Sequence, residues 1–518
     1  MTKSVRESNP IIRMDYPDLD VIRVGEYFYM ISTSMYFMPG GEILRSKDLQ
    51  TWEHASFVFD TLDHTPKQTL EGEEHAYGQG MWAASLRYHN ERYYVCFVAN
   101  DTGKTYLYTA SDIEGPWEKS TIEGFFHDAS LLFDEGRVFI VYGNRSIYLT
   151  ELDRELHAPL PGGLHRMLLC DENNPSLGYE GSHLYRIRNK YYLLLIHSLP
   201  DRWRRVQACF VSDSLEGEFL GGDVFDEDFG HMNQGIAQGG IVDTPDGDWY
   251  SILFQDRGAV GRLPVLIPIR WEGDRLLYDV NGKLPTIQRE ENEDAPIMPL
   301  ASSDDFKRLD QALPLDRKKH GCFGFRSFWQ FNHEPDLSLI HHDETAGIFS
   351  ILTGKLCQNV TQARNTLTQR MMEPSCAGEV WVDGSLLRVG DYAGLCALQG
   401  SYGLVAVTKK EDATYLVMRS KVLMNDQVTE QEWERIPLDH PEVHLKLEVT
   451  FQNQSNDQKD EATFYYEKAG EWKQIGIKHA LFFRLDHFTG CRFGLFTYAT
   501  QEIGGQGSFR EFTYRVPQ

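Results

Sequence analysis

Residues 21–30 read VIRVGEYFYM, which is an apolar segment, a Gly-Glu pair and a second segment rich in aromatic residues. Such a pattern around two turn residues is typical of a β-hairpin. It returns in the first three hundred residues at 86–94, 131–139, 184–192 and 241–250. A period of roughly 45 to 60 residues with several short strands is typical of propeller blades. The repeat therefore predicts a five-bladed β-propeller from about Asn9 to Leu284.

The second part of the chain has a different pattern. From Asp304 onward the repeat is gone, but short alternating segments with Gly or Asn/Asp turns continue, for example at 380–382, 402–407 and 444–449. This pattern predicts an all-β protein whose second domain is a β-sandwich of the jelly-roll, concanavalin-like type. The charged, Pro-broken segment 289–296 resembles a linker. We therefore expect a propeller domain at 1–300 and a sandwich domain at 301–518.

Composition limits the classes of partner. The chain has 518 residues and a net charge of −25, a field that would repel the phosphates of nucleic acid and of anionic membranes. No apolar run approaches the roughly 20 residues that span a bilayer. The N-terminus shows no signal peptide, and the eight cysteines are scattered without a C-x-x-C pair. We expect reduced thiols in a cytoplasmic protein, and the oligomeric state, including a homo-oligomer, stays open.

Three carboxylates recur just ahead of the first strand of a blade: Asp18, Asp128 and Glu180. Each alone has an ordinary interpretation, as a turn residue for Asp18 and Asp128 or a solvated surface acid for Glu180. In a propeller, however, these strand starts converge on the central axis at one face. Convergent carboxylates in different surroundings can divide acid and base roles at neutral pH. We expect Glu180, beside Tyr179, to act as a general acid and Asp18 as the base for a water molecule, as in inverting glycosidases.

Four motifs, in their order and spacing, resemble glycoside hydrolase family 43: 16–18 (YPD), 81–83 (MWA), 127–130 (HDAS) and 179–185 (YEGSHLY). The segments 353–356, 362–370 and 390–395 are similar to the sandwich that follows the propeller in the β-xylosidases of that family. The resemblance implies a five-bladed propeller and inversion of anomeric configuration. It also implies that Asp18 is the general base, Glu180 the general acid and Asp128 the residue that orients the acid and tunes its protonation.

The resemblance suggests four substrate-binding residues, each with a structural alternative. Trp82 is expected in the wall or floor of the sugar pocket, or in the core between blades. Phe37 is expected on a loop that contacts substrate, or packed in that loop. Arg262 is expected to bind sugar, or to form a structural ion pair. Phe509 is expected to reach from the sandwich to the pocket, or to be a buried strand residue.

Metal ligands are left unassigned. Many members of the family carry a His before the fifth-blade strand that helps hold a central metal, often calcium. Here residues 237–240 read AQGG and His231 lies a few residues earlier, so a structural calcium remains an open expectation. No zinc spacing, P-loop, nucleophile elbow or dinucleotide motif is present, and no cofactor is expected for catalysis.

These observations predict an exo-acting, inverting hydrolase that releases terminal xylose from xylo-oligosaccharides, a β-1,4-xylosidase. An α-L-arabinofuranosidase acting on arabinoxylan or arabinan oligosaccharides is the alternative, because the family contains both activities. A non-catalytic sugar-binding propeller is the rival from another class, but it would not need an acid, a base and a tuning carboxylate together. A protein-interaction propeller would be expected to expose an apolar patch.

Overall fold

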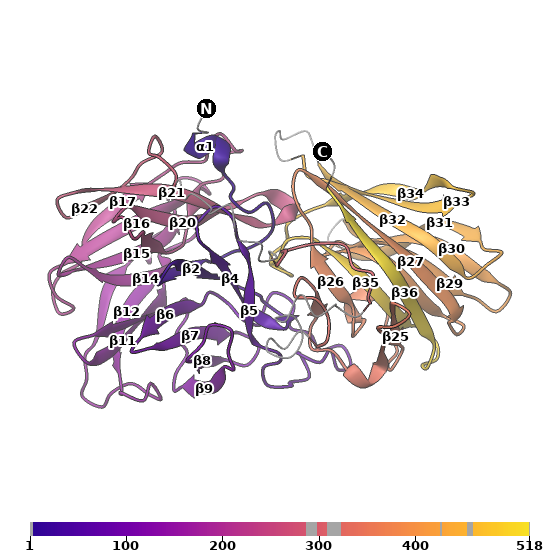
Figure 1. Ribbon diagram of the computed structural model, residues 1–518, viewed down its shortest axis with the longest axis horizontal. Helices are drawn as coiled ribbons and strands as arrows, with labels where there is room; N and C mark the ends of the chain where they lie inside the picture. Colours follow the sequence, from indigo (N-terminus) through magenta and orange to yellow (C-terminus); the bar gives the residue numbers. More distant parts are fainter. Residues whose placement is uncertain (1–3, 286–297, 308–322, 425–426, 453–458, 517–518) are drawn as a thin grey trace.

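The computed structural model describes residues 4–285, 298–307, 323–424, 427–452 and 459–516 (Figure 1). The expected linker at 289–296 lies outside these residues. Within them, the helices are α1 (Val5–Ser8) and the short 3-10 helices η1 (Gly258–Val260), η2 (Leu337–Leu339) and η3 (Val360–Gln362). All other regular elements are strands, which confirms the all-β prediction. No helix in the described part of the chain is long and apolar enough to cross a membrane.

Five antiparallel sheets make up the first domain, on the left of Figure 1. Blade 1 contains β1 (Asp20–Val24), β2 (Tyr27–Ile31), β4 (Gly40–Ser46) and β5 (Glu53–Phe59); blade 2 contains β6 (Ser85–His89), β7 (Arg92–Ala99), β8 (Lys104–Ala110) and β9 (Glu118–Ile122); blade 3 contains β10 (Ser130–Asp134), β11 (Arg137–Asn144), β12 (Ser146–Leu152) and β13 (His165–Cys170); blade 4 contains β14 (Glu180–Ile187), β15 (Lys190–Ser198), β16 (Arg205–Ser212) and β17 (Leu220–Phe225); blade 5 contains β18 (Ile236–Ala237), β19 (Ile241–Asp243), β20 (Trp249–Asp256), β21 (Arg262–Glu272) and β22 (Arg275–Tyr278).

The first strands of the blades form the inner ring. β1 lies beside β6, β6 beside β10 and β10 beside β14, and β19 of the last blade returns to β1. The five-bladed propeller predicted from the repeat is therefore confirmed. Large side chains fill the space between adjacent blades, such as Tyr29, Tyr93, Phe59 and Phe97 between blades 1 and 2. Burial of each such side chain stabilises the fold by roughly 1.5–3 kcal/mol.

The second domain is a sandwich of two antiparallel sheets, on the right of Figure 1, as the sequence predicts. One sheet contains, in spatial order, β3 (Phe37–Met38), β23 (Gln330–Asn332), β26 (Leu367–Arg370), β35 (Arg492–Ala499), β28 (Asp391–Leu398), β29 (Gly403–Lys409), β30 (Thr414–Met424) and β31 (Gln427–Pro437); the other contains β24 (Ile340–Asp343), β25 (Ile348–Leu352), β36 (Gln506–Arg515), β27 (Ser375–Leu386), β32 (Glu442–Thr450), β33 (Asp460–Lys468) and β34 (Glu471–Leu481).

The two domains share a strand and buried charges. β3 comes from the propeller part of the chain but pairs with β23, so it extends a sheet of the sandwich. Arg370 of β26 donates to the carboxylate of Glu42 on β4 at 2.6 Å. The N–H of Gly490, in the loop between β34 and β35, donates to Asp15 at 2.7 Å. The sandwich therefore packs against the segment that leads into Asp18.

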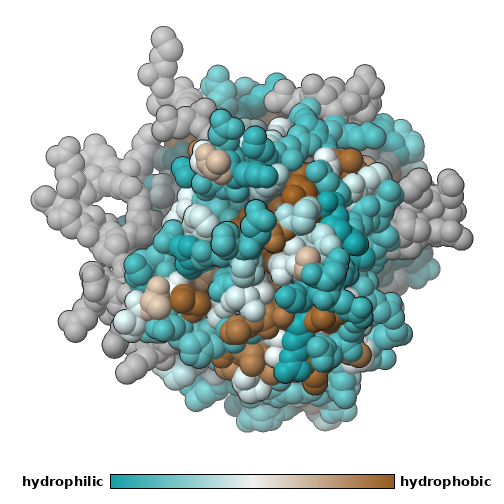
Figure 2. Space-filling view, turned by 90° about the vertical axis from the view of Figure 1, so that its right-hand side faces the viewer, coloured by the Kyte–Doolittle hydropathy of each residue, from teal (hydrophilic) through white to brown (hydrophobic). Residues whose placement is uncertain are grey.

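The outer end of the sandwich has a mixed surface. Figure 2 shows mostly hydrophilic residues there, with hydrophobic residues in a broken band across the face. Every cysteine that the structure describes is free, and all of them except Cys170 are buried.

Candidate active site

The three predicted carboxylates lie where inner strands begin. Asp18 precedes β1, Asp128 precedes β10, and Glu180 is the first residue of β14. Asp18 and Asp128 adopt positive φ values of 53° and 47°, which aspartate tolerates better than most residues do. Because the inner strands are neighbours around the axis, their first residues meet at one face of the propeller. The sequence-based expectation that the three carboxylates share one site therefore agrees with this geometry.

Asp128 and Glu180 belong to one cluster with His127. One ligand-type atom from each of these residues lies within 4.8 Å of the others. His127 Nε2 is 3.6 Å from Asp128 Oδ1 and 3.7 Å from Glu180 Oε2. The N–H of Gly181 donates to Asp128 Oδ2 at 3.2 Å. Asp128 thus holds the backbone next to Glu180, as expected for a residue that orients the acid.

Gly181 itself is required by this arrangement. Its φ is +64°, and a Cβ at this position would lie 2.8 Å from the side chain of Gln238. A larger residue would strain the backbone and displace the N–H that binds Asp128.

Burial and neighbouring charges shift the pKa values of Asp128 and His127. Burial raises the pKa of Asp128 to about 7; the nearby charge of His127 opposes this shift, and the charges of Glu180 and Asp18 add to it. Burial alone would lower the pKa of His127, but the carboxylates of Asp128, Glu180 and Asp18 raise it to about 9. The neighbouring carboxylates therefore favour the imidazolium form of His127, which lies between two carboxyl groups.

Asp18 has a different partner. Both of its carboxylate oxygens accept hydrogen bonds from Arg262 Nη1, at 2.9 and 3.2 Å, and both side chains are almost completely buried. Arg262 lies at the start of β21 in blade 5 and was expected to bind sugar or to form a structural ion pair. It forms an ion pair, and its partner is the predicted base.

Aromatic side chains from both domains surround the ion pair and the cluster. The Trp82 ring is 5.8 Å from the His127 ring and 5.5 Å from the Phe488 ring. The ring of Phe488, in turn, stacks on the guanidinium group of Arg262 at 4.5 Å. Trp82 is only partly buried, and its sugar contact stays a prediction.

Phe488 belongs to the sandwich and was missed by sequence reasoning, as were His127 and Asn144 as members of the site. Asn144 Nδ2 donates to Glu180 Oε2 at 2.6 Å. His127 adjoins a predicted site residue and could have been considered, but neither Asn144 nor Phe488 lies in a motif that marks it.

Two expected substrate contacts are contradicted. Phe509 is 1% exposed and packs against Phe349 in the core of the sandwich, because it alternates inward along β36. Phe37 is also 1% exposed, and the guanidinium group of Arg492 lies 3.5 Å from its ring centroid at the domain junction. For both residues the structural alternative applies, and the sandwich residue that reaches the site is Phe488.

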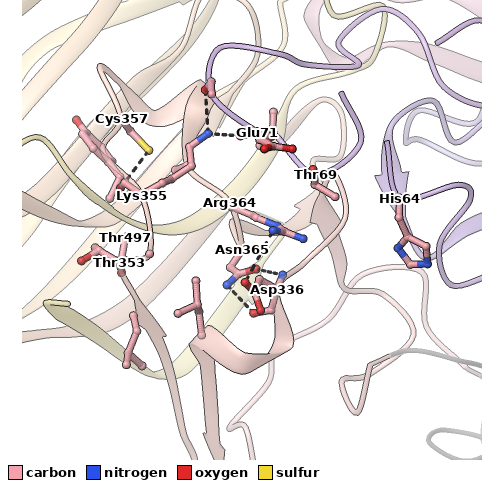
Figure 3. A pocket seen from close by; sticks show the side chains of 17 residues that line it. His64, Thr69, Glu71, Asp336, Thr353, Lys355, Cys357, Arg364, Asn365 and Thr497 are labelled. Atoms are coloured by element: carbon pink, nitrogen blue, oxygen red, sulfur yellow. Dashed lines mark hydrogen bonds and ion pairs between the residues drawn. The ribbon is translucent and has the colours of Figure 1, made fainter. Parts of the chain in front are cut away.

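A cavity of about 410 Å³ lies at the domain junction, and none of the predicted site residues lines it. Figure 3 shows Lys355 and Arg364 of the sandwich pointing toward the propeller segment 64–72. Lys355 donates to the carbonyl oxygens of Leu70 and Gly72, and Arg364 to those of Glu334 and Pro335. Both cations already bind backbone oxygens, and Lys355 joins the sandwich to the propeller segment.

The grouped His, Cys, Asp and Glu side chains that the structure describes supply few oxygen ligands for the expected calcium ion. Among the described residues, the only grouped metal-type ligands are His127, Asp128 and Glu180, which offer two carboxylates and an imidazole. Calcium takes six to eight oxygen ligands. His231, the His nearest to the expected position, instead lies 3.2 Å from Arg257 Nη1. The expected calcium stays untested, and no catalytic step is derived through a metal.

Comparison with known proteins gives matches to both domains. Residues 7–276 match the family model described as glycosyl hydrolases family 43, and residues 325–515 match the β-xylosidase C-terminal concanavalin A-like domain. A β-xylosidase of Formosa agariphila is 24% identical, over 98% of this chain and 90% of its own length. A xylosidase/arabinosidase 43B of Humicola insolens is 26% identical, over 90% of this chain and 88% of its own.

Among solved structures, a bifunctional GH43-CE protein of Bacteroides eggerthii is 37% identical, with a TM-score of 0.87 over 98% of this chain. This chain covers 64% of that protein's length. An engineered GH43 enzyme with endo-xylanase and exo-arabinofuranosidase activity is 26% identical, with a TM-score of 0.85 over 98% of this chain and 99% of that one. The first family model alone covers more than half of the sequence, so this chain belongs to glycoside hydrolase family 43 and is a glycoside hydrolase.

Proposed function

We propose that this enzyme releases terminal xylose from the ends of xylo-oligosaccharides with inversion of configuration, as a β-1,4-xylosidase. The observation that carries the proposal is the division of the carboxylates into two environments. Asp18 is paired with Arg262, whereas Glu180 lies with Asp128, His127 and Asn144. Two carboxyl groups held by different partners suit an acid and a base that act on opposite sides of one sugar ring.

In this mechanism Glu180 donates its proton to the glycosidic oxygen as the bond from that oxygen to the anomeric carbon breaks. Asp18 accepts a proton from a water molecule, and the oxygen of this water forms the new bond to the anomeric carbon. Asp128 keeps the backbone at Gly181 in place and so orients the acid. Arg262 holds the Asp18 carboxylate in a single orientation toward the water.

The names of similar proteins support xylose- or arabinose-containing substrates. β-Xylosidase is the name of the Formosa agariphila protein, and xylosidase/arabinosidase that of the Humicola insolens protein. A Bacteroides ovatus relative is named as a non-reducing end α-L-arabinofuranosidase. α-L-Arabinofuranosidase activity is therefore the second candidate function. Initial rates on nitrophenyl β-xyloside and nitrophenyl α-L-arabinofuranoside separate the two, and absence of activity on both would contradict the proposal.

The stereochemical outcome tests the mechanism directly. A single displacement by water converts a β-xyloside into α-xylose, and no glycosyl-enzyme forms. Proton NMR of the anomeric region in the first minutes of hydrolysis should therefore show α-xylose before mutarotation. Initial β-xylose would require a double displacement, with one of the carboxylates acting as a nucleophile.

The roles of acid and base are tested with the leaving group. Glu180→Ala should lose much more activity on xylobiose than on an aryl xyloside with an activated leaving group, because the latter needs little protonation. Asp18→Ala should lose activity on both, since water must be activated in each case. If both variants lost the same fraction of activity on both substrates, Glu180 could not be assigned as the acid and Asp18 as the base.

A further inference from the structure

The hairpin between β11 and β12 binds the backbone just ahead of both carboxylates of the cluster. The N–H of Gly143 donates to the carbonyl oxygen of His127 at 3.0 Å, and the N–H of Arg145 donates to that of Tyr179 at 2.7 Å. His127 precedes Asp128 in the chain, and Tyr179 precedes Glu180. One hairpin thus connects the two strand starts from which the cluster is built.

Asn144 lies between these two anchor points, and its amide Nδ2 donates to Glu180 Oε2 at 2.6 Å. The hairpin is closely packed and anchored by hydrogen bonds. Gly143 has a φ of +143°, and a Cβ there would lie 2.1 Å from the carbonyl oxygen of Ser146. The guanidinium group of Arg145 donates to the carbonyl oxygens of Asn174 and Ser176. Although the side chain of Asn144 is exposed, its backbone is therefore held on both sides.

The two oxygens of Glu180 are not equivalent. Oε2 accepts the amide hydrogen of Asn144 and faces His127 Nε2 at 3.7 Å. Among the described residues, no hydrogen-bond donor lies on Oε1. In a neutral carboxyl group the carbonyl-type oxygen is the better acceptor, so the oxygen that accepts from Asn144 is not the one that carries the proton.

We propose that Asn144 is a positioning residue that confines the acidic proton of Glu180 to Oε1. The inference rests on the proposed function, in which Glu180 is the general acid. Asn144 orients the carboxyl group before proton transfer, and its N–H remains on Oε2 to stabilise the carboxylate that transfer leaves behind. Hydrogen bonds to charged groups are stronger than those to neutral ones, so the bond to Asn144 strengthens as the proton leaves.

The test compares Asn144→Ala and Asn144→Asp with Ser146→Ala. Ser146 lies in the same hairpin and donates to Glu172, not to Glu180, so its variant removes a side-chain hydrogen bond without touching the acid. Asn144→Ala should lower kcat/KM for xylobiose roughly tenfold to hundredfold, the range expected for one hydrogen bond to a charged group. The loss on dinitrophenyl β-xyloside should stay below about threefold. Ser146→Ala should match the wild type on both substrates.

The pH profile gives a readout that a purely structural role would not change. An N–H on a carboxylate favours its ionised form, so removing it keeps the acid protonated to higher pH. The alkaline limb of kcat/KM should move to higher pH in Asn144→Ala. It should move further in Asn144→Asp, because a carboxylate added to those of Glu180 and Asp128 opposes the ionisation of Glu180. Thermal midpoints of the three variants should stay close to that of the wild type.

The outcomes separate the inference from the proposed function. If Glu180→Ala shows the leaving-group dependence and Asn144→Ala loses activity equally on both substrates, or shows no shift of the alkaline limb, the role of Asn144 is overturned alone. If Glu180→Ala itself shows no dependence on the leaving group, the acid is misassigned and both proposals fail. A selective loss on xylobiose together with the alkaline shift supports the inference.

Discussion

At the scale of single residues, burial of Asp128 in the active site destabilises the folded protein when its carboxyl group ionises. It is buried beside two other carboxylates, and its pKa is raised to about 7. A group with a raised pKa in the folded state contributes stability that is fully present below its unfolded value, near 4, and is lost as pH rises through about 7. The ionised form of the buried Asp128 carboxyl group is therefore the form that is less favourable to folding.

This argument predicts the behaviour of Asp128→Asn. The amide can still accept the hydrogen bond from Gly181, but it does not ionise, so the variant should lose less stability than the wild type between pH 4 and pH 7. The difference should reach at least about 1 kcal/mol in the free energy of unfolding. Urea denaturation across this range checks it, with Asp246→Asn, an exposed turn residue, as the control. Parallel curves for Asp128→Asn and the wild type would contradict the assigned pKa.

At the scale of elements, Phe488 and Phe509 show how the position of a phenylalanine in a loop or on a strand decides what its ring contacts. Phe488 lies in the loop between β34 and β35, with a φ of 59° and its ring on Arg262. Phe509 lies on β36, where alternation turns it inward. A phenylalanine in a loop can reach another domain, whereas one on the inner face of a sheet cannot leave its own core.

A pair of alanine substitutions tests this distinction. Phe488→Ala should lower kcat/KM about tenfold or more, because it removes the ring that stacks on Arg262 and helps to hold this residue in its ion pair with Asp18. The denaturation midpoint should change little. Phe509→Ala should destabilise the protein by roughly 3–5 kcal/mol through the cavity it leaves. Folded Phe509→Ala enzyme should keep nearly normal kinetic constants. Activity loss in soluble, folded Phe509→Ala without loss of stability would reverse the assignment of the two residues.

At the scale of the whole molecule, a buried ion pair connects the sandwich to the propeller. Arg370 donates to Glu42 at 2.6 Å and to the carbonyl oxygen of Asp15 at 2.9 Å. Burial alone would raise the pKa of Glu42, but Arg370 and His54 lower it to about 2. Because Asp15 also binds Gly490, the sandwich holds the segment that ends in Asp18. The second domain therefore contacts the segment that positions Asp18.

Removal of this charge pair should be costly. Glu42→Gln leaves Arg370 buried without its counter-charge and should destabilise the protein by roughly 3–5 kcal/mol at pH 7. Glu42 contributes its stability above about pH 4.5 and loses it as pH falls toward 2, so the gap between variant and wild type should narrow in acid. Glu53→Gln is the matched control, since Glu53 pairs with Arg45 at a partly exposed site. Equal losses in the two variants would exclude a special role for the buried pair.

The fold and the three carboxylates could be predicted because their signals are local. A hairpin with alternating residues is visible in ten residues, and its return along the chain defines the blades. Asp18, Asp128 and Glu180 each lie next to such a strand, so the repeat alone brings them to one face. The sandwich was predictable for the same reason, from period-two alternation and turn residues.

The partners of these carboxylates were decided only by the tertiary structure. Arg262 and Asp18 are 244 positions apart, and their ion pair depends on how blade 5 meets blade 1. For Phe37 and Phe509 the sequence left a substrate contact and a buried position open, because aromatic residues have the same local pattern in a pocket and in a core. Phe488 lies in a loop and Asn144 is the last residue of β11 at a tight turn, two places where strand alternation does not reveal what a side chain contacts. Sequence by itself determined which backbone positions converge, because hydrogen-bonded strands repeat locally, whereas packing between distant segments determined which side chains those positions meet.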